Sequence, residues 1–237
     1  PSTYMALSRS LFPPGGSRDP FWNEAAATLF AATLEDLGRR GHVATNVGLQ
    51  RALTRGSLED LATLLEGSDA ARFLDKNAAA MQASIIATVA AGLKGWRALA
   101  DLDAHLAGPA GSVLPPPFSI RSFVAGEGEA RDSWLFLSTR EGDAALMKPL
   151  LSLWADIAAA ALLSLPQTRA PAQMWAIFDE VASLQRLPAL EPLLARGRKH
   201  GAAVVLGLQS LAQLQQAYGR EGAAALLSQP QTWLVLR

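Results

Sequence analysis

The pattern of apolar and polar residues divides the chain into two parts. From about residue 20 to residue 107, apolar residues recur at helical spacing, and Ala and Leu predominate. The stretch 19–41, DPFWNEAAATLFAATLEDLGRRG, begins with an Asp-Pro helix start, and SLEDLATLLEG (57–67) offers Ser57 as its N-cap. Helical spacing then continues from Asp69 to Leu106. This pattern predicts an all-α region of three or four helices.

The second part follows the Gly- and Pro-rich stretch AGPAGSVLPPPFSI (107–120), which cannot continue a helix. Beyond it, short apolar runs alternate with helical patterns. The predicted strands are SWLFLST (133–139), QMWAIFDE (173–180), AAVVLGLQS (202–210) and TWLVLR (232–237), and the predicted helices are 141–165, 189–201, 211–219 and 221–229. Apolar strands that alternate with helices predict an α/β unit built on a buried parallel sheet.

Composition narrows the class of protein. Half of the 237 residues are hydrophobic, so a sizeable core is expected. Lys plus Arg and Asp plus Glu both number 21, so no overall basic field points to nucleic acid. The chain has no cysteines, which excludes disulfides and thiolate metal sites, and its three histidines are too scattered to form a ligand set.

Membrane spans and signal peptides have no clear counterpart in the sequence. The longest apolar run, LLSLWADIAAAALLSLP, is interrupted by Asp156 and ends at Pro166, so we expect a buried helix there. The first residues lack a basic region followed by an apolar one.

Two adjacent acids, Asp179 and Glu180, end the apolar run of the second predicted strand. In an open parallel sheet, chemistry gathers at the carboxyl ends of the strands. Such a pair is the Walker B arrangement of P-loop ATPases, in which the Asp holds Mg²⁺ and the Glu orients or deprotonates the attacking water. The same pair is also compatible with two solvated acids at a strand end, and the residues alone leave both interpretations open.

Two further residues bear on this choice. Gln209 ends the next predicted strand, where a polar side chain would contact the γ-phosphate or the water; the alternative is a helix start. Arg198 lies in a cluster of cations before Gly201. It fits either a helix C-terminus, which favours cations, or an arginine finger that reaches the nucleotide of a neighbouring subunit.

The segment FDEVASLQRLPALEPLLARGRKHGAAVVLGLQSLAQLQQAYG resembles the region around Walker B in type IV secretion and conjugative coupling proteins of the TraD/TrwB kind. DPFWNEAAATLF resembles the start of their inserted all-α domain, and WLFLST and SQPQTWLVLR match in place. The resemblance covers almost the entire chain. It implies a RecA-like α/β motor domain with an all-α insertion: residues 1–18 as an N-terminal segment of the motor, 19–114 as the all-α domain, and 115–237 as the motor portion with Walker B.

The family implies a membrane-anchored, hexameric, DNA-stimulated ATPase at the cytoplasmic face of the bacterial inner membrane. Its partners would be single-stranded DNA, relaxase and relaxosome proteins, and type IV secretion components, and its cofactors ATP and Mg²⁺. Carried over, Asp179 would be the Mg²⁺-associated acid, acting through water, and Glu180 the catalytic acid. Gln209 would sense the γ-phosphate, and Arg198 would act across the subunit interface.

The P-loop of the family, GxxxxGK[ST], is absent from the chain, because GPAGSV has neither the spacing nor the Lys. The transmembrane helices of the family are absent as well. We therefore expect a later part of a longer protein that, by itself, binds ATP poorly and is a monomer.

Other functions stay open on the sequence. The chain could be a non-enzymatic docking module for relaxosome or effector proteins, or a motor of the FtsK/HerA type that moves double-stranded DNA. Cations of the helical region, such as Arg39 and Arg40, are interleaved with acids such as Glu35 and Asp36. This arrangement fits a solvated face of mixed charge as well as a DNA contact.

Overall fold

The computed structural model describes residues 2–14, 20–40, 46–54, 57–99, 118–127, 132–168 and 174–235. Most of the predicted linker at 107–120 lies outside these ranges. Contacts divide the chain into one unit of residues 1–118 and 139–150 and a second of residues 119–138 and 151–237. The division into domains at 1–18, 19–114 and 115–237 stays a prediction.

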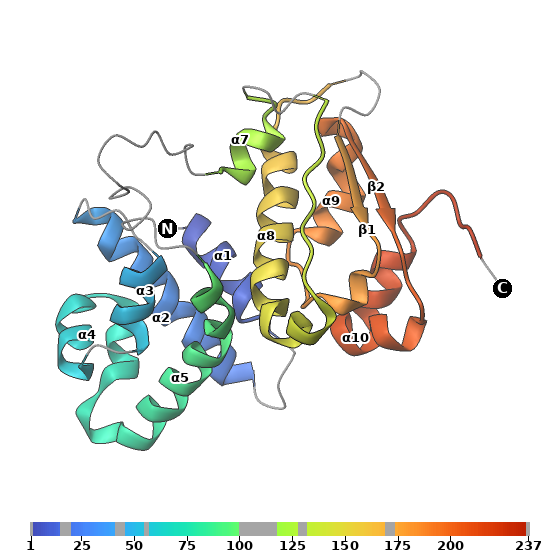
Figure 1. Ribbon diagram of the computed structural model, residues 1–237. Helices are drawn as coiled ribbons and strands as arrows, with labels where there is room; N and C mark the ends of the chain where they lie inside the picture. Colours follow the sequence, from blue (N-terminus) through green and yellow to red (C-terminus); the bar gives the residue numbers. More distant parts are fainter. Residues whose placement is uncertain are drawn as a thin grey trace. The chain divides into compact units, whose positions relative to one another are not determined.

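The first unit is helical (blue to green in Figure 1). Its centre is α2 (Pro20–Arg39), which packs against α1 (Ser2–Leu11), α3 (Asn46–Thr54) and α5 (Ala79–Gly92). Ala25, Ala26 and Ala27 of α2 are buried beside Leu29 and Phe30, so small side chains let the neighbouring helices approach closely. The remaining elements are α4 (Leu58–Leu64), η1 (Asp69–Leu74), η2 (Lys76–Ala78), η3 (Lys94–Ala98) and η5 (Glu141–Asp143).

The sequence predicted the helix that is α2 and the N-cap at Ser57. It also predicted a continuous helical stretch from residue 69, and this prediction is wrong. Ser57 Oγ accepts the Asp60 N–H at 3.0 Å, as predicted for an N-cap. From residue 69, however, 3₁₀ segments η1, η2 and η3 flank α5. The Asp75 side chain accepts the Asn77 N–H at 2.9 Å, and this local bond competes with the α-helical pattern.

The second unit contains a two-stranded parallel sheet, β1 (Met174–Phe178) and β2 (Ala202–Leu206), in which Met174 pairs with Ala202 and Phe178 with Leu206. The chain passes from β1 to β2 through η6 (Val181–Ser183), α9 (Leu190–Arg196) and η7 (Gly197–His200). Before β1 come α7 (Ile120–Val124) and α8 (Ala144–Ser164), whose residues from 151 onward belong to this unit. After β2 comes α10 (Leu211–Leu227), broken at Gly219, where φ is 75°. The break separates the two helices that the sequence predicted.

Helices α8, α9 and α10 supply most of the core of the second unit. Leu190 and Leu214 pack with Phe178 and Leu206 in one cluster, and Leu162, Leu193 and Ala202 form another. Residues alternate in burial along β1, as a strand with one covered face requires. Trp175, Ile177 and Val205 remain exposed.

Two predicted strands are absent from the described residues. Residues 133–139 and 232–235 pair with no strand there. Their apolar side chains are largely exposed: Phe136 at 78% and Leu234 at 83%. Trp134 stacks on Phe136, with ring centroids 6.1 Å apart. The local sequence favours an extended backbone, but a strand also needs a partner for its backbone hydrogen bonds, and none is present among the described residues.

Residues 141–164 are long and apolar enough to cross a membrane by length and composition. Half of the most apolar window is buried inside the protein. Ser152 and Asp156, both buried on α8, accept backbone hydrogen bonds from a loop of the same unit. The helix therefore serves the protein core here, as the sequence predicted.

The loop at residues 184–189 connects η6 to α9 and is fixed by three buried side chains from two helices. Its alternate backbone N–H groups donate to them: Gln185 to Ser152 Oγ at 2.8 Å, Leu187 to Tyr218 Oη at 3.2 Å, and Ala189 to Asp156 Oδ1 at 2.7 Å. Ser152 and Asp156 share a face of α8 because they are one helical turn apart. Asp156 also places a negative charge at the N-terminus of α9, which lacks a side-chain cap of its own.

Tyr218→Phe should flatten the alkaline loss of stability. Burial raises the pKa of Tyr218 to about 12 from its usual 10.0, so the fold favours the neutral phenol. This contribution is complete below pH 10 and disappears as the pH rises through 12. A pKa that is higher by about 2 in the folded state corresponds to roughly 3 kcal/mol of folding stability. Urea unfolding at a series of pH values should therefore show a steeper loss in the wild type than in the variant, and equal slopes would contradict the assignment.

Candidate functional site

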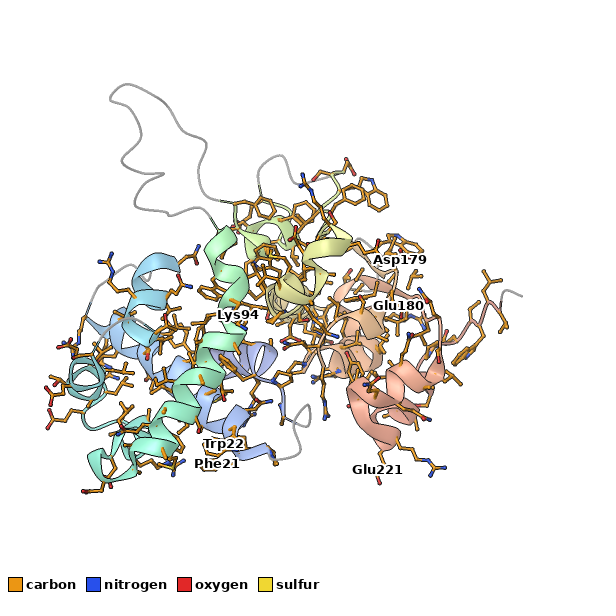
Figure 2. The ribbon with its side chains drawn as sticks, turned by 60° about the horizontal axis from the view of Figure 1, so that its bottom comes forward. Phe21, Trp22, Lys94, Asp179, Glu180 and Glu221 are labelled. Atoms are coloured by element: carbon orange, nitrogen blue, oxygen red, sulfur yellow. The ribbon has the colours of Figure 1, made fainter. Side chains whose placement is uncertain are left out.

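Asp179 and Glu180 directly follow β1, at the carboxyl edge of the two parallel strands (Figure 2). Asp179 is exposed, and Glu180 is half-buried. The apolar run places them there, because Met174, Ala176 and Phe178 face the core and fix the strand up to its last residue. The site thus pairs an accessible carboxylate with a shielded one.

Gly207, the first residue after β2, forms backbone hydrogen bonds with the residues before and after the acid pair. Its N–H donates to the Phe178 carbonyl at 2.6 Å, and its carbonyl accepts the Val181 N–H at 3.2 Å. These bonds enclose Asp179 and Glu180 between two fixed backbone points. The bend after the strand is therefore set by the neighbouring strand.

The two chain segments approach so closely at Gly207 that no side chain fits there. A Cβ on Gly207 would lie 1.8 Å from the Asp179 carbonyl oxygen and 2.7 Å from its carbonyl carbon. Both are backbone atoms, which cannot rotate away as a side chain does. Gly207 is thus required by the position of Asp179, although its φ is not in the left-handed region.

The carboxylate of Glu180 has one satisfied oxygen and one unsatisfied oxygen. Oε2 accepts the Gln209 backbone N–H at 3.2 Å. Oε1 is buried and, within the described residues, has no hydrogen-bond partner. A buried carboxylate oxygen without a donor is costly, so this atom fits a site for a water molecule or another donor. Together with exposed Asp179, it offers the oxygen ligands that Mg²⁺ and its bound waters prefer.

Gln209 lies three residues beyond the end of β2, so the strand is shorter than predicted. The contact with Glu180 comes from its backbone N–H, and its side chain is exposed. Ser210, the next residue, caps α10 by accepting the Ala212 N–H. The structure therefore brings Gln209 to the acid pair; a role of its side chain toward a phosphate stays a prediction.

Arg198 lies at the opposite edge of the sheet from the acids. It belongs to η7, four residues before β2 begins, whereas Glu180 follows the end of the parallel strand β1. Five strand residues span about 16 Å. Gly201 ends the helical segment with φ 77°, and its N–H donates to the Arg198 carbonyl, as expected of a C-terminal cap. Within one chain, Arg198 and the acid pair do not meet.

Comparison with known proteins identifies the family. The protein-family model described as the type IV secretion-system coupling protein DNA-binding domain matches residues 1–237. The chain belongs to this coupling-protein family. It is 32% identical to the coupling protein TraD of Escherichia coli (strain K12) over 220 residues, which are 92% of this chain and 29% of TraD.

Solved structures of the coupling protein TrwB show the same fold. The form bound to the non-hydrolysable GTP analogue GDPNP superposes with a TM-score of 0.78 at 28% identity, and the form bound to ADP and Mg²⁺ with 0.72 at 27%. Each alignment covers 96% of this chain and 51% of the TrwB chain. The predicted fold class, a RecA-like α/β motor portion with an all-α insertion, is confirmed. This chain spans about half of TrwB and three-tenths of TraD.

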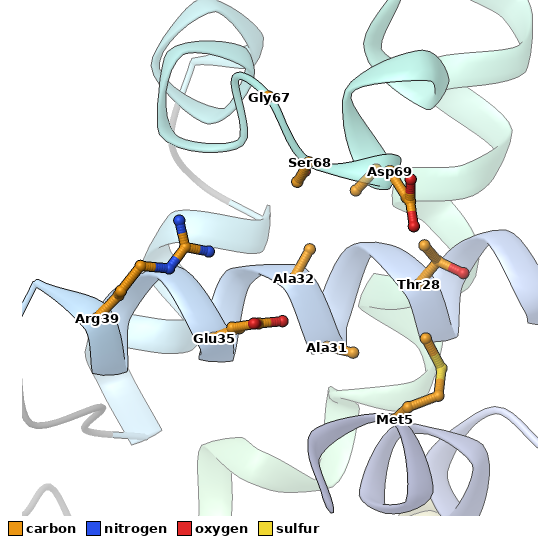
Figure 3. Close-up of a pocket in the computed structure, with 10 residues that line it drawn as sticks. Met5, Thr28, Ala31, Ala32, Glu35, Arg39, Gly67, Ser68 and Asp69 are labelled. Carbon is orange, nitrogen blue, oxygen red and sulfur yellow. The ribbon is translucent and has the colours of Figure 1, made fainter. Parts of the chain in front are cut away.

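The helical unit of this coupling-protein chain contains a pocket of about 530 Å³ (Figure 3). Met5, Ala31, Ala32 and Ala70 contribute apolar groups to its lining, and Glu35, Arg39 and Asp69 contribute charged groups. The pocket therefore presents charges of both signs beside apolar side chains.

Asp36 binds the paired cations that the sequence offered for DNA contact. Its carboxylate lies 2.6 Å from Arg40 Nε and 4.0 Å from an Arg39 nitrogen, and Asp36 itself is buried. The arginines thereby compensate a buried charge of their own helix, which favours the structural interpretation for this pair.

Gly207 and the loop at 184–189 are site features that sequence reasoning missed. The signal for Gly207 was a glycine interrupting the apolar run AAVVLGL just before Gln209. The signal for the loop was weaker, since Ser152 and Asp156 lie more than 30 residues from the backbone groups that they bind.

Gly207→Ala should separate the two strand ends and displace Asp179. Overpacking of this kind typically costs roughly 1–3 kcal/mol, and the clash here is with backbone. Urea unfolding of the chain measures the loss. Gly142→Ala is the matched control, because a Cβ there meets nothing within 4 Å, and its effect should stay within about 0.5 kcal/mol. Equal stability of the two variants would refute the close approach at Gly207.

Proposed function

We propose that this chain is the cytoplasmic part of a conjugative coupling protein that works as a DNA-stimulated ATPase. In this proposal the complete protein is anchored at the bacterial inner membrane. It delivers relaxase-bound single-stranded DNA to a type IV secretion channel. The chain contributes the Walker B acids and the all-α domain, and the phosphate cradle comes from outside these residues, since no GxxxxGK[ST] occurs in them.

The observation that supports this proposal most strongly is the state of Glu180. One carboxylate oxygen is held by the Gln209 N–H, while the other is buried without a donor within the described residues. A merely solvated acid would expose both oxygens to water. A held carboxylate with one free, shielded oxygen is the arrangement that a base needs to accept a proton from a positioned water.

Each site residue then has a defined task. Asp179, exposed at the same edge, would hold Mg²⁺ through a bound water. Glu180 Oε1 would orient the attacking water and accept its proton, and the bond from the Gln209 N–H to Oε2 holds the carboxylate in place. The exposed Gln209 side chain would contact the γ-phosphate. When bound, Mg²⁺ neutralises charge on the phosphates of ATP.

Arg198 would act on the nucleotide of a neighbouring subunit in a homo-hexamer. Its place at the opposite edge from the acids of its own chain supports action in trans. The solved structures of TrwB with GDPNP, with ADPNP and with ADP and Mg²⁺ support a nucleotide site in the complete protein.

A second candidate function is protein docking by the helical unit, with the α/β unit as a scaffold. The pocket beside α2, lined by apolar groups and charges of both signs, favours it. A relaxase, another relaxosome protein or a secretion component would supply the bound side chain. Docking and ATP hydrolysis are compatible in one protein, but docking alone requires no turnover at Glu180.

Glu180→Gln should lower DNA-stimulated ATP turnover of the complete protein by about 10²- to 10⁴-fold. Gln retains an oxygen that accepts the Gln209 N–H, so the fold and the affinity for nucleotide should be nearly unchanged. Phosphate release assays with and without single-stranded DNA measure the effect. Glu191→Gln, an exposed acid of α9, is the control and should retain full turnover. Retained turnover in Glu180→Gln would remove Glu180 from catalysis, and no DNA-stimulated turnover in the wild type would favour docking.

Mixing Arg198→Ala subunits with wild-type subunits should reduce turnover more steeply than the wild-type fraction falls. Loss of a cation that acts across an interface inactivates the neighbour's site, and arginine fingers contribute 10³- to 10⁵-fold to rate. In a ring whose subunits hydrolyse ATP in turn, one inactive site also slows the other sites, so the loss exceeds the fraction of variant subunits. Turnover measured over a series of mixing ratios tests this, with Arg196→Ala as a control two residues away. A linear dependence on the wild-type fraction would support the helix-cap interpretation of Arg198.

A further inference from the structure

Arg186 is an exposed cation at the edge of the sheet that contains the acid pair. It lies in the loop at 184–189, between η6, which begins directly after Glu180, and α9, which leads to the start of β2. Helix α9 and η7 together reach from the carboxyl edge to the amino edge, so the loop before α9 stays at the carboxyl edge. Arg186 and the acids therefore share one end of the second unit, unlike Arg198.

The backbone on both sides of Arg186 is fixed from within the unit. The Gln185 N–H donates to buried Ser152, and the Leu187 N–H donates to buried Tyr218. Leu187 is 2% exposed and belongs to the core cluster, whereas Arg186 and Pro188 face outward. A long cationic side chain thus extends from a rigid base, which lowers the entropy lost when it binds a ligand.

Arg186 forms no ion pair within the described part of the chain. Within its own unit the charge of Arg186 acts on buried Tyr218, whose pKa it lowers against the larger effect of burial, and this is a weaker use of the charge than an ion pair. The planar guanidinium instead remains available for an external anion, and its paired N–H groups match the oxygens of a phosphate.

We propose that Arg186 is a phosphate-binding residue, presented at the carboxyl edge by the fixed loop at 184–189. The proposal rests on the proposed function in one respect, since the phosphate would lie on the same edge as Asp179 and Glu180. Two sources supply this chemistry: the terminal phosphate of a nucleotide and the backbone of single-stranded DNA. The fixed loop would present Arg186 in the same way to either phosphate, so the experiment has to distinguish the two.

Arg186→Gln in the complete protein tests the proposal, with two separate binding measurements. Fluorescent methylanthraniloyl-ATP with Mg²⁺ reports the nucleotide, and fluorescein-labelled oligothymidylate over a series of salt concentrations reports single-stranded DNA. If the nucleotide is the source, its Kd should rise by about 10-fold. If DNA is the source, the slope of log K against log salt should become shallower by about 0.7, the value for one lost phosphate contact.

Three further variants make the result specific. Arg186→Lys keeps the charge but loses the paired donors, so it should fall between the wild type and Arg186→Gln. Tyr218→Phe keeps the Arg186 side chain but removes the acceptor of the Leu187 N–H. The loop is then less firmly held, so the same phosphate contact should weaken by a smaller factor. Arg121→Gln removes an exposed cation from α7, which packs near Met174 and Ala202 at the other edge, and should change neither measurement.

A change in either measurement that is largest in Arg186→Gln, smaller in Arg186→Lys and Tyr218→Phe, and absent from Arg121→Gln supports the proposal and identifies the source of the phosphate. Wild-type nucleotide affinity together with a wild-type salt slope in Arg186→Gln would overturn it, as would an equal change in Arg121→Gln. Thermal unfolding of each variant shows whether the fold is retained. ATP turnover in Glu180→Gln is a separate measurement, so failure of the ATPase proposal and failure of this one are distinguishable.

Discussion

The close approach of the two strand ends at Gly207 is the constraint on which the candidate site depends. Backbone atoms of Gly207 bind the residues on both sides of the acid pair, and the space beside Asp179 has no room for a side chain. This contact fixes where the acids emerge from the sheet. It also brings Gln209, which lies two residues after Gly207, within hydrogen-bonding distance of Glu180.

Buried polar groups of α8 and α10 also fix the backbone of the next loop, at residues 184–189. Ser152, Asp156 and Tyr218 place acceptors inside an apolar helix layer, where an unpaired polar group would be costly. Each is matched by a backbone N–H of the loop that follows the acids. The cost of burying these groups is thereby exchanged for a defined loop conformation. Asp156, which interrupts the most apolar run of the sequence, is the clearest example.

The sequence predicted the parts of the fold that depend on local pattern. Apolar spacing located α2, β1, α9 and both halves of α10, and the Walker B acids stood out because they end an apolar strand. It failed where partners decide the outcome. Residues 133–139 have strand composition but no strand beside them among the described residues. The Gly207 contact and the bonds to the loop at 184–189 join distant positions, so no local window contains both partners.

The bond between Glu180 and Gln209 also has a mechanical side. Gln209 is followed at once by the Ser210 cap, so the start of α10 is attached to the carboxylate by two residues of backbone. A shift of Glu180 would therefore reach the first turn of this helix through the backbone of Gln209 and Ser210. At Gly219, where φ is 75° and ψ is 168°, the backbone departs from helical geometry and the helix is kinked, so its two halves need not move together. Such a shift would therefore move the first half of α10 more than the second.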